Sequence, residues 1–213
     1  MFALIKREVR DNIVYFLGAV ILAMAFIAIL VSLFFYNEAG KLPRTALRAC
    51  IFIGGFMLTF GSCCLGAAQM YSDRTKNISA FLSSRSVTRN QILIARIISG
   101  ILVIAVVLVP LTVTTVAFMR LAVEPFLAEY YLSAYWHVYL MAFLMAFACY
   151  LLGMQTGWTS NKLTPTMGGL ALVCLLLPLV IVKGFGLQIF VILVIFICAS
   201  LVRVWSKFIS TPL

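Results

Sequence analysis

Residues 13–36 read IVYFLGAVILAMAFIAILVSLFFY and contain no charged side chain. A helix needs about 20 predominantly apolar residues to cross the roughly 30 Å hydrocarbon core of a bilayer. The run is longer than the apolar region of about 7–15 residues found in a secretory signal peptide. No cleavage site of the small-x-small type follows it. The stretch therefore predicts a retained transmembrane helix and not a cleaved signal.

The composition extends this prediction to most of the chain. Apolar residues make up 64% of the 213 residues, and charged residues only 10%. Soluble domains contain roughly 45–50% apolar and about 25% charged residues, so one buried core cannot absorb the excess. Continuous apolar runs favour helices over barrel strands, which alternate apolar and polar residues. We predict an all-α polytopic membrane protein, a single domain over residues 1–213, with six spans at 13–36, 49–71, 97–119, 136–157, 165–182 and 185–202.

The lysines and arginines lie mostly in alternate loops. With the N-terminus inside, the inner residues are Lys6, Arg7, Arg10, Arg74, Lys76, Arg85, Arg89, Arg96, Lys162, Arg203 and Lys207. The outer ones are Lys41, Arg44, Arg48, Arg120 and Lys183, three of them in the first outer loop. This bias predicts that both termini are cytoplasmic. Because the basic residues cluster at the ends of apolar runs, the net charge of +10 indicates lipid headgroups as partners and no nucleic acid.

The six predicted spans contain no Asp, Glu, Lys or Arg. Transporters driven by protons or sodium usually hold ionisable groups at membrane depth. If this protein moves a solute uphill, the energy must therefore come from another polypeptide. We expect the polar residues of the spans to hydrogen-bond between helices. They are Thr59, Ser62, Gln69, Thr112, Thr114, Thr115, Gln155 and Thr156.

We find no set of residues suited to catalysis. His137 is the single histidine, no buried Ser-His or His-Asp pair can be built, and no G-x-x-x-x-G-K-[ST] phosphate loop is present. The six cysteines, none in a C-x-x-C pair, are interpreted as small apolar packing residues, with metal binding or a disulfide as alternatives. We predict no enzymatic activity, no catalytic residue, no metal and no cofactor in this chain.

The first residues, FALIKREVRDN, have a helical period. Phe2, Ile5 and Val9 share one face. The charged residues are assigned to the opposite face: Lys6, Arg7, Glu8, Arg10 and Asp11. This pattern predicts an amphipathic helix over residues 1–12 that lies in the cytoplasmic interface.

The segment after the second predicted span, SDRTKNISAFLSSRSVTRNQILIAR, is long for an inner loop. Ser72 is predicted to cap a helix over residues 72–86, with Asp73 in its first turn. Ile78, Phe81 and Leu82 are spaced i, i+3 and i+4, which gives that helix an apolar face. Periodicity alone leaves two readings open: the helix lies among the headgroups, or it docks on a soluble partner.

The order of these elements resembles the ABC-2 type permease family, the membrane subunits of ATP-driven exporters. That family places an acidic residue, a helix ending in an apolar pair and a Val-Ser/Thr-Arg turn before its third span. The matching positions are Asp73 for the acid, Phe81 and Leu82 for the pair, Val87, Thr88 and Arg89 for the turn, and Arg96 for a following basic residue. The departures are Asp for Glu at 73, Asn77 and Ile78 for Gly-Thr, and Ser86 for Pro.

The resemblance implies a division of labour between chains. In that family two permease subunits pair, and each docks on a cytoplasmic ATPase that holds the ATP and Mg²⁺. It implies that residues 72–86 are a coupling helix and that the loop 72–89 binds the ATPase, with Phe81 and Leu82 filling a groove on it. The other contact residues implied are Asp73, Arg74, Lys76, Ile78, Arg85 and Arg89. The chain would be a permease subunit that exports a hydrophobic or amphipathic substrate across a bacterial cytoplasmic membrane.

Gly153 and Gly157 form G-x-x-x-G in the fourth predicted span, a spacing that permits close helix approach within one subunit or between two. Three rival interpretations of function stay open. The chain could be a non-transporting scaffold that recruits a soluble partner through the same loop, a facilitator that conducts without ATP, or an intramembrane enzyme.

Overall fold

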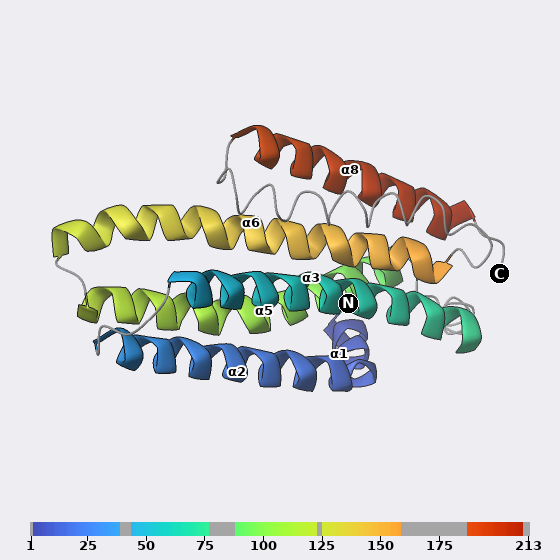
Figure 1. Ribbon diagram of the computed structural model, residues 1–213. Coiled ribbons are helices and arrows are strands. Elements are labelled where there is room, and N and C mark those ends of the chain that lie inside the picture. Colours follow the sequence, from blue (N-terminus) through green and yellow to red (C-terminus); the bar gives the residue numbers. More distant parts are fainter. Residues whose placement is uncertain (1, 39–43, 77–87, 123–124, 159–186, 211–213) are drawn as a thin grey trace.

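The computed structural model describes residues 2–38, 44–76, 88–122, 125–158 and 187–210. Every element in these ranges is a helix; the long helices lie alongside one another in an elongated bundle, and the short helix α1 lies across it at one end of α2 (Figure 1). They are α1 (Phe2–Asp11), α2 (Ile13–Glu38), α3 (Arg44–Lys76), α5 (Arg89–Ala122), α6 (Pro125–Trp158) and α8 (Leu187–Ser210).

Four helices are long and apolar enough to cross a membrane, over Ile53–Ser72, Arg89–Ala117, Tyr135–Gly157 and Leu187–Phe208. α1 and α2 meet the same criteria only as a pair, which is bent by 69°. An all-helical protein with several membrane-span-like helices is therefore confirmed. Of the six predicted spans, 165–182 lies outside the described residues and the other five each overlap one helix. The count of six and the orientation stay predictions.

A corner at Asn12 separates α1 from α2. The side-chain amide of Asn12 donates to the Glu8 carbonyl over 2.8 Å, and its backbone N–H donates to the same oxygen over 3.0 Å. The Asn12 carbonyl in turn accepts the N–H of Tyr15 over 3.0 Å. Asn12 thus ends one helix and begins the next. The helix predicted over 1–12 is present, and it packs against α5.

α3 continues to Lys76, past the predicted end of the second span at residue 71. Ser72 lies inside this helix, so the prediction that it caps a separate coupling helix is wrong. Extending an existing helix adds one hydrogen bond per residue, whereas a new helix must first be nucleated. Residues 72–76 contain no Gly or Pro that would stop the extension. The rest of the predicted coupling helix, residues 77–86, lies outside the described residues.

α3 and α6 form the tightest seam in the described part of the bundle. A Cβ at Gly153 would collide with the backbone of Cys63, and one at Gly157 with the backbone of Ala67. Small residues allow two helix backbones to approach this closely. Residues 145–155 of α6 are all buried, which makes α6 the central helix. The G-x-x-x-G motif is therefore used inside the chain, against α3.

The polar residues of the spans divide into two groups. Gln69, Thr115 and Gln155 bond to neighbouring helices, as predicted; the Thr115 hydroxyl, for example, lies 2.6 Å from the Tyr139 hydroxyl. The others instead donate to a carbonyl three or four residues earlier in their own helix, because a short hydroxyl side chain reaches that oxygen easily. They are Thr59, Ser62, Thr112, Thr114 and Thr156.

Candidate functional site

Arg96 is the most deeply buried charged residue that the structure describes. It lies in α5 within the apolar stretch Arg89–Ala117, and only 2% of it is exposed. The sequence placed this residue at the entrance to the third span, because the predicted span started after the last charge. That boundary is wrong, since α5 begins at Arg89 and carries Arg96 into the bundle. Arg, Lys, Asp and Glu are rare inside spans and often mark functional sites.

Glu8 of α1 is the carboxylate that faces this arginine. Its Oε1 lies 3.5 Å from Arg96 Nε, and the Glu8 side chain is only 13% exposed. The prediction that Glu8 belongs to the charged face, opposite Ile5 and Val9, is therefore wrong. Glu8 follows Leu4 and Ile5 at i+4 and i+3, so it lies on the half-buried face of α1. α1 is bound to the bundle by an ion pair as well as by apolar contacts.

The guanidinium of Arg96 also touches two softer groups. Its Nη1 lies 3.6 Å from the sulfur of Met70 on α3, and its Cζ lies 5.8 Å from the centre of the Phe208 ring on α8. A desolvated cation over an aromatic face gains about 2 kcal/mol. The charge is thus surrounded by side chains from α1, α3 and α8.

A hydrogen-bond network lies directly against the arginine backbone. Gln69 of α3 donates to Ser99 over 3.0 Å, and Ser99 donates to the Arg96 carbonyl over 2.8 Å. The hydroxyl of Tyr150 on α6 lies 2.6 Å from Gln69 Oε1 and 2.8 Å from the same carbonyl. Its single proton serves one of these acceptors at a time. Gly100 lies against the Tyr150 ring, where a Cβ would collide with it.

The Arg96 cluster, defined as Glu8, Gln69, Arg96, Ser99 and Tyr150, joins four helices at one level of the bundle. A buried ion pair is often no more stabilising than apolar residues of the same shape, whereas removing one partner costs about 3–5 kcal/mol. The contribution of the Glu8–Arg96 ion pair is therefore to the relative placement of the helices. It fixes where α1 sits against α5.

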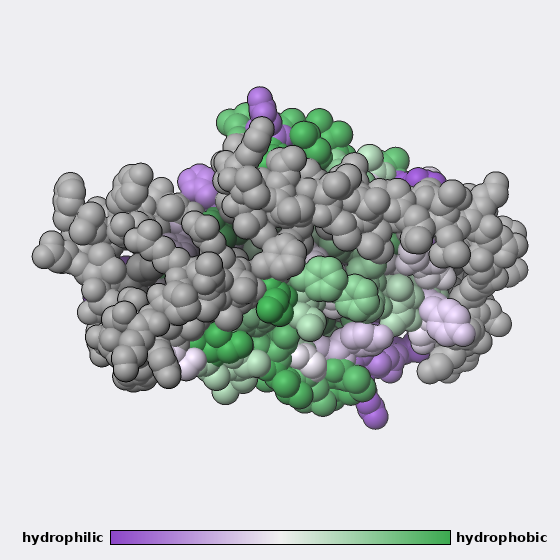
Figure 2. Space-filling model, in the orientation of Figure 1, coloured by the Kyte–Doolittle hydropathy of each residue, from purple (hydrophilic) through white to green (hydrophobic). Residues whose placement is uncertain are grey.

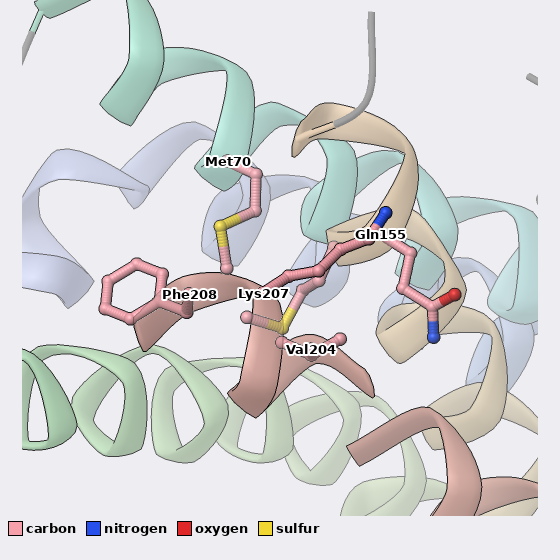
Figure 3. A pocket seen from close by; sticks show the side chains of 6 residues that line it. Met70, Gln155, Val204, Lys207 and Phe208 are labelled. Carbon is pink, nitrogen blue, oxygen red and sulfur yellow. The ribbon is translucent and has the colours of Figure 1, made fainter. Parts of the chain in front are cut away.

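A small cavity of about 10 Å³ lies beside the cluster, lined by Met70, Met154, Gln155, Val204, Lys207 and Phe208. Figure 3 shows Lys207 reaching from α8 towards Gln155 on α6, while Met70 points from α3 towards α8. This space suits about one water molecule and is too small for a substrate. It is a packing gap where three helices converge.

Four of the eight predicted ATPase-binding residues lie in described helices. Asp73, Arg74 and Lys76 belong to the last turn of α3, and Arg89 is the first residue of α5. Ile78, Phe81, Leu82 and Arg85 lie outside the described residues. In α1, Ile5 and Val9 are half-buried as the apolar face requires, and Phe2 is described only by its backbone.

Sequence reasoning missed both charged members of the cluster, although each left a signal. Arg96 is the one charge in the apolar run QILIARIISGILVI. Glu8 is the one acidic residue at helical spacing from Leu4 and Ile5 on the apolar side of α1. A single charged residue in an apolar segment, together with a single residue of opposite charge on the apolar side of another helix, indicates a buried ion pair.

Within the described residues, no group of three or more His, Cys, Asp or Glu is arranged to hold a metal ion. Comparisons with protein-family models, with curated proteins and with solved structures found no match to this chain.

Proposed function

We propose that this chain is a permease subunit of an ATP-driven transporter of the ABC-2 type, docking a separate ATPase through the loop 72–89. Its substrate class in this proposal is hydrophobic or amphipathic, and it pairs with a second permease subunit. The proposal rests on the sequence resemblance around that loop and on the helices that enter and leave it.

The observation that carries the proposal is the position of the Arg96 cluster relative to the loop. Gln69 lies seven residues before the end of α3, and Arg96 lies seven residues after the start of α5. At 1.5 Å per residue, each is about 10 Å along its helix from the loop. A partner that displaces the loop therefore acts on two helix ends that the cluster joins to each other and to α1.

The charges of the spans are consistent with an external energy source. Arg96 lies in a span, but an arginine does not lose its proton in a protein and so cannot carry one. The four span-like stretches contain no Asp or Glu. Coupling by a buried carboxylate, which is common in proton-driven and sodium-driven carriers, has no candidate in these stretches. The buried carboxylate of Glu8 lies outside them, in α1, where it is paired with Arg96.

In the proposed mechanism, ATP binding closes the ATPase pair and shifts the docked loop. The ends of α3 and α5 follow the loop because they are continuous with it. α1 follows α5 because Glu8 is held by Arg96. α2 is joined to α1 at Asn12, so the movement reaches the first span as well.

Co-purification tests this proposal. The tagged full-length chain, extracted from its native membrane, is expected to bring an ATP-hydrolysing subunit with it. Phe81→Asp should remove that subunit, because buried apolar anchors dominate such interfaces. Ser83→Asp adds the same charge to the same loop without removing an anchor and should retain it. Absence of any ATPase from the unmodified chain would contradict the proposal and favour the scaffold interpretation.

A further inference from the structure

An open apolar groove of about 240 Å³ runs along the bundle between α2 and α3, with α5 as its floor. Its walls include Gly18 and Leu22 of α2, Gly61 and Leu65 of α3, and its floor includes Ile104. We propose that this groove binds one acyl chain of an anionic lipid, with the headgroup at α1. The site is independent of whether an ATPase docks on the chain.

The two helices that form the groove meet beyond the end that lies away from α1. Near the far end, the Phe26 ring of α2 fills the space in which a Cβ at Gly54 of α3 would lie, so the two helices touch there. At the other end, Val14 and Tyr15 line the groove within the first turn of α2, directly after the corner at Asn12. This end of the groove therefore lies next to α1.

The lining suits hydrocarbon better than water. Empty apolar cavities stay dry unless polar partners hold the water. Ser62 is one of the few polar residues of the lining, and its hydroxyl already donates to the Leu58 carbonyl over 2.8 Å. A Cβ at Gly18 or Gly61 would meet nothing within 4 Å, so both positions border open space.

The length of the groove suits a single acyl chain. The groove follows two turns of α2, from Val14 to Leu22, which is about 12 Å of length. A linear acyl chain matches this narrow, elongated shape.

Charge at the open end selects the headgroup. Lys6 and Arg10 are exposed on α1, whereas Arg7 is paired with Asp11 at 3.5 Å. Figure 2 shows hydrophobic surface over the middle of the described bundle and hydrophilic side chains where α1 lies. Lipid tails gain no hydrophobic free energy by moving from bilayer to groove, so shape and headgroup attraction must supply the preference. Lys6 and Arg10 provide that attraction for an anionic lipid.

Photo-crosslinking tests this proposal on the full-length chain in phosphatidylcholine nanodiscs doped with a diazirine-acyl probe. With a phosphatidylglycerol probe, adducts should concentrate on half-buried groove residues such as Leu22 and Val103. The exposed residues Ile195 and Val202 of α8 report contact with bulk lipid. Filling the groove with Gly18→Leu and Gly61→Leu should lower groove adducts about tenfold, the loss expected from about 1.4 kcal/mol. Gly55→Leu, also in open space but outside the groove, should leave them unchanged.

The preference for an anionic headgroup is tested by comparing two probes that differ only in the headgroup. A phosphatidylcholine probe should label the groove less than the phosphatidylglycerol probe, and Lys6→Gln with Arg10→Gln should abolish that difference. Equal labelling by both probes in the unmodified chain would overturn the anionic preference. Groove adducts no more frequent than those on α8 would overturn the site itself, and that comparison needs no variant. Neither outcome depends on recovering an ATPase.

Discussion

The two faces of α3 differ in how they meet their neighbours. On one side, Gly153 and Gly157 bring the α6 backbone directly onto Cys63 and Ala67. On the other side, among the described side chains, Phe26 of α2 lies against Gly54, and a groove of about 240 Å³ lies between the two helices. Backbone contact leaves two helices no space to slide or tilt against each other, whereas an open groove between two helices leaves them that space. The comparison indicates a rigid unit of α3 and α6 and a separately held unit of α1 and α2.

The separately held unit is attached at specific points. α2 packs chiefly on α5, and α1 is fixed to α5 through Glu8 and Arg96. A unit held this way can follow α5 when α5 moves, while the backbone contacts keep α3 and α6 together. This arrangement is what the proposed coupling mechanism requires. Substitutions in the α3–α6 unit and in the α1–α2 unit should therefore change stability by different amounts.

The largest effect is expected at the rigid seam. Gly153→Leu places a side chain against the Cys63 carbonyl, and backbone atoms cannot move aside as side chains do. Overpacking typically costs about 1–3 kcal/mol, and we expect more than about 4 kcal/mol here because backbone is blocked. Thermal unfolding of the purified protein in detergent measures this loss. Gly55→Leu, on the partner helix α3, meets nothing within 4 Å and should unfold within a few degrees of the unmodified chain.

The second effect concerns the attachment of α1. Glu8→Leu leaves the buried guanidinium of Arg96 without its carboxylate and should cost about 3 kcal/mol. Because α1 loses its anchor, amide hydrogen exchange should rise in residues 2–11 more than in α6. Arg10→Leu removes an exposed charge from the same helix and should change exchange little. Equal protection of α1 in Glu8→Leu and the unmodified chain would contradict this attachment.

The smallest effect is expected where α2 meets α3. Phe26→Ala removes the ring that lies on Gly54, and lipid tails can fill the space at little cost. The free energy of unfolding should fall by less than about 1 kcal/mol. Phe147→Ala in the buried core is the matched comparison and should cost about 3–5 kcal/mol. Similar losses for the two variants would show that α2 is packed as tightly as α6.

The length of the apolar runs was sufficient to predict five helices of the bundle. The ends of these helices were not predictable in the same way. Each predicted span was ended at the nearest charged residue, whereas the helices continue past such residues. Arg96 was left outside its span for this reason, and Ser72 was assigned to a new helix that α3 instead absorbs. Local hydrophobicity predicts which residues lie in the membrane. Where a helix ends depends instead on whether its backbone hydrogen bonds continue.

The candidate site was harder to predict because its parts are distant in the sequence. Gln69 was identified as a polar residue of a predicted span and Tyr150 was not, and the bonds that join them to each other, to Ser99 and to the Arg96 carbonyl depend on how three helices pack. Glu8 was misassigned because charge alone was taken to indicate the exposed face. The G-x-x-x-G motif predicted a close approach, and only the structure shows that the approached helix is α3 of the same chain.

The most direct test of this account is a double-mutant cycle between Glu8 and Arg96, measured by unfolding of the purified protein in lipid nanodiscs. Glu8→Leu and Arg96→Met are made singly and together. If the ion pair fixes α1 to α5, the double variant should be more stable than Glu8→Leu alone, with a coupling energy of about 2 kcal/mol. If the two losses add to within about 0.5 kcal/mol, the residues are independent and the account fails.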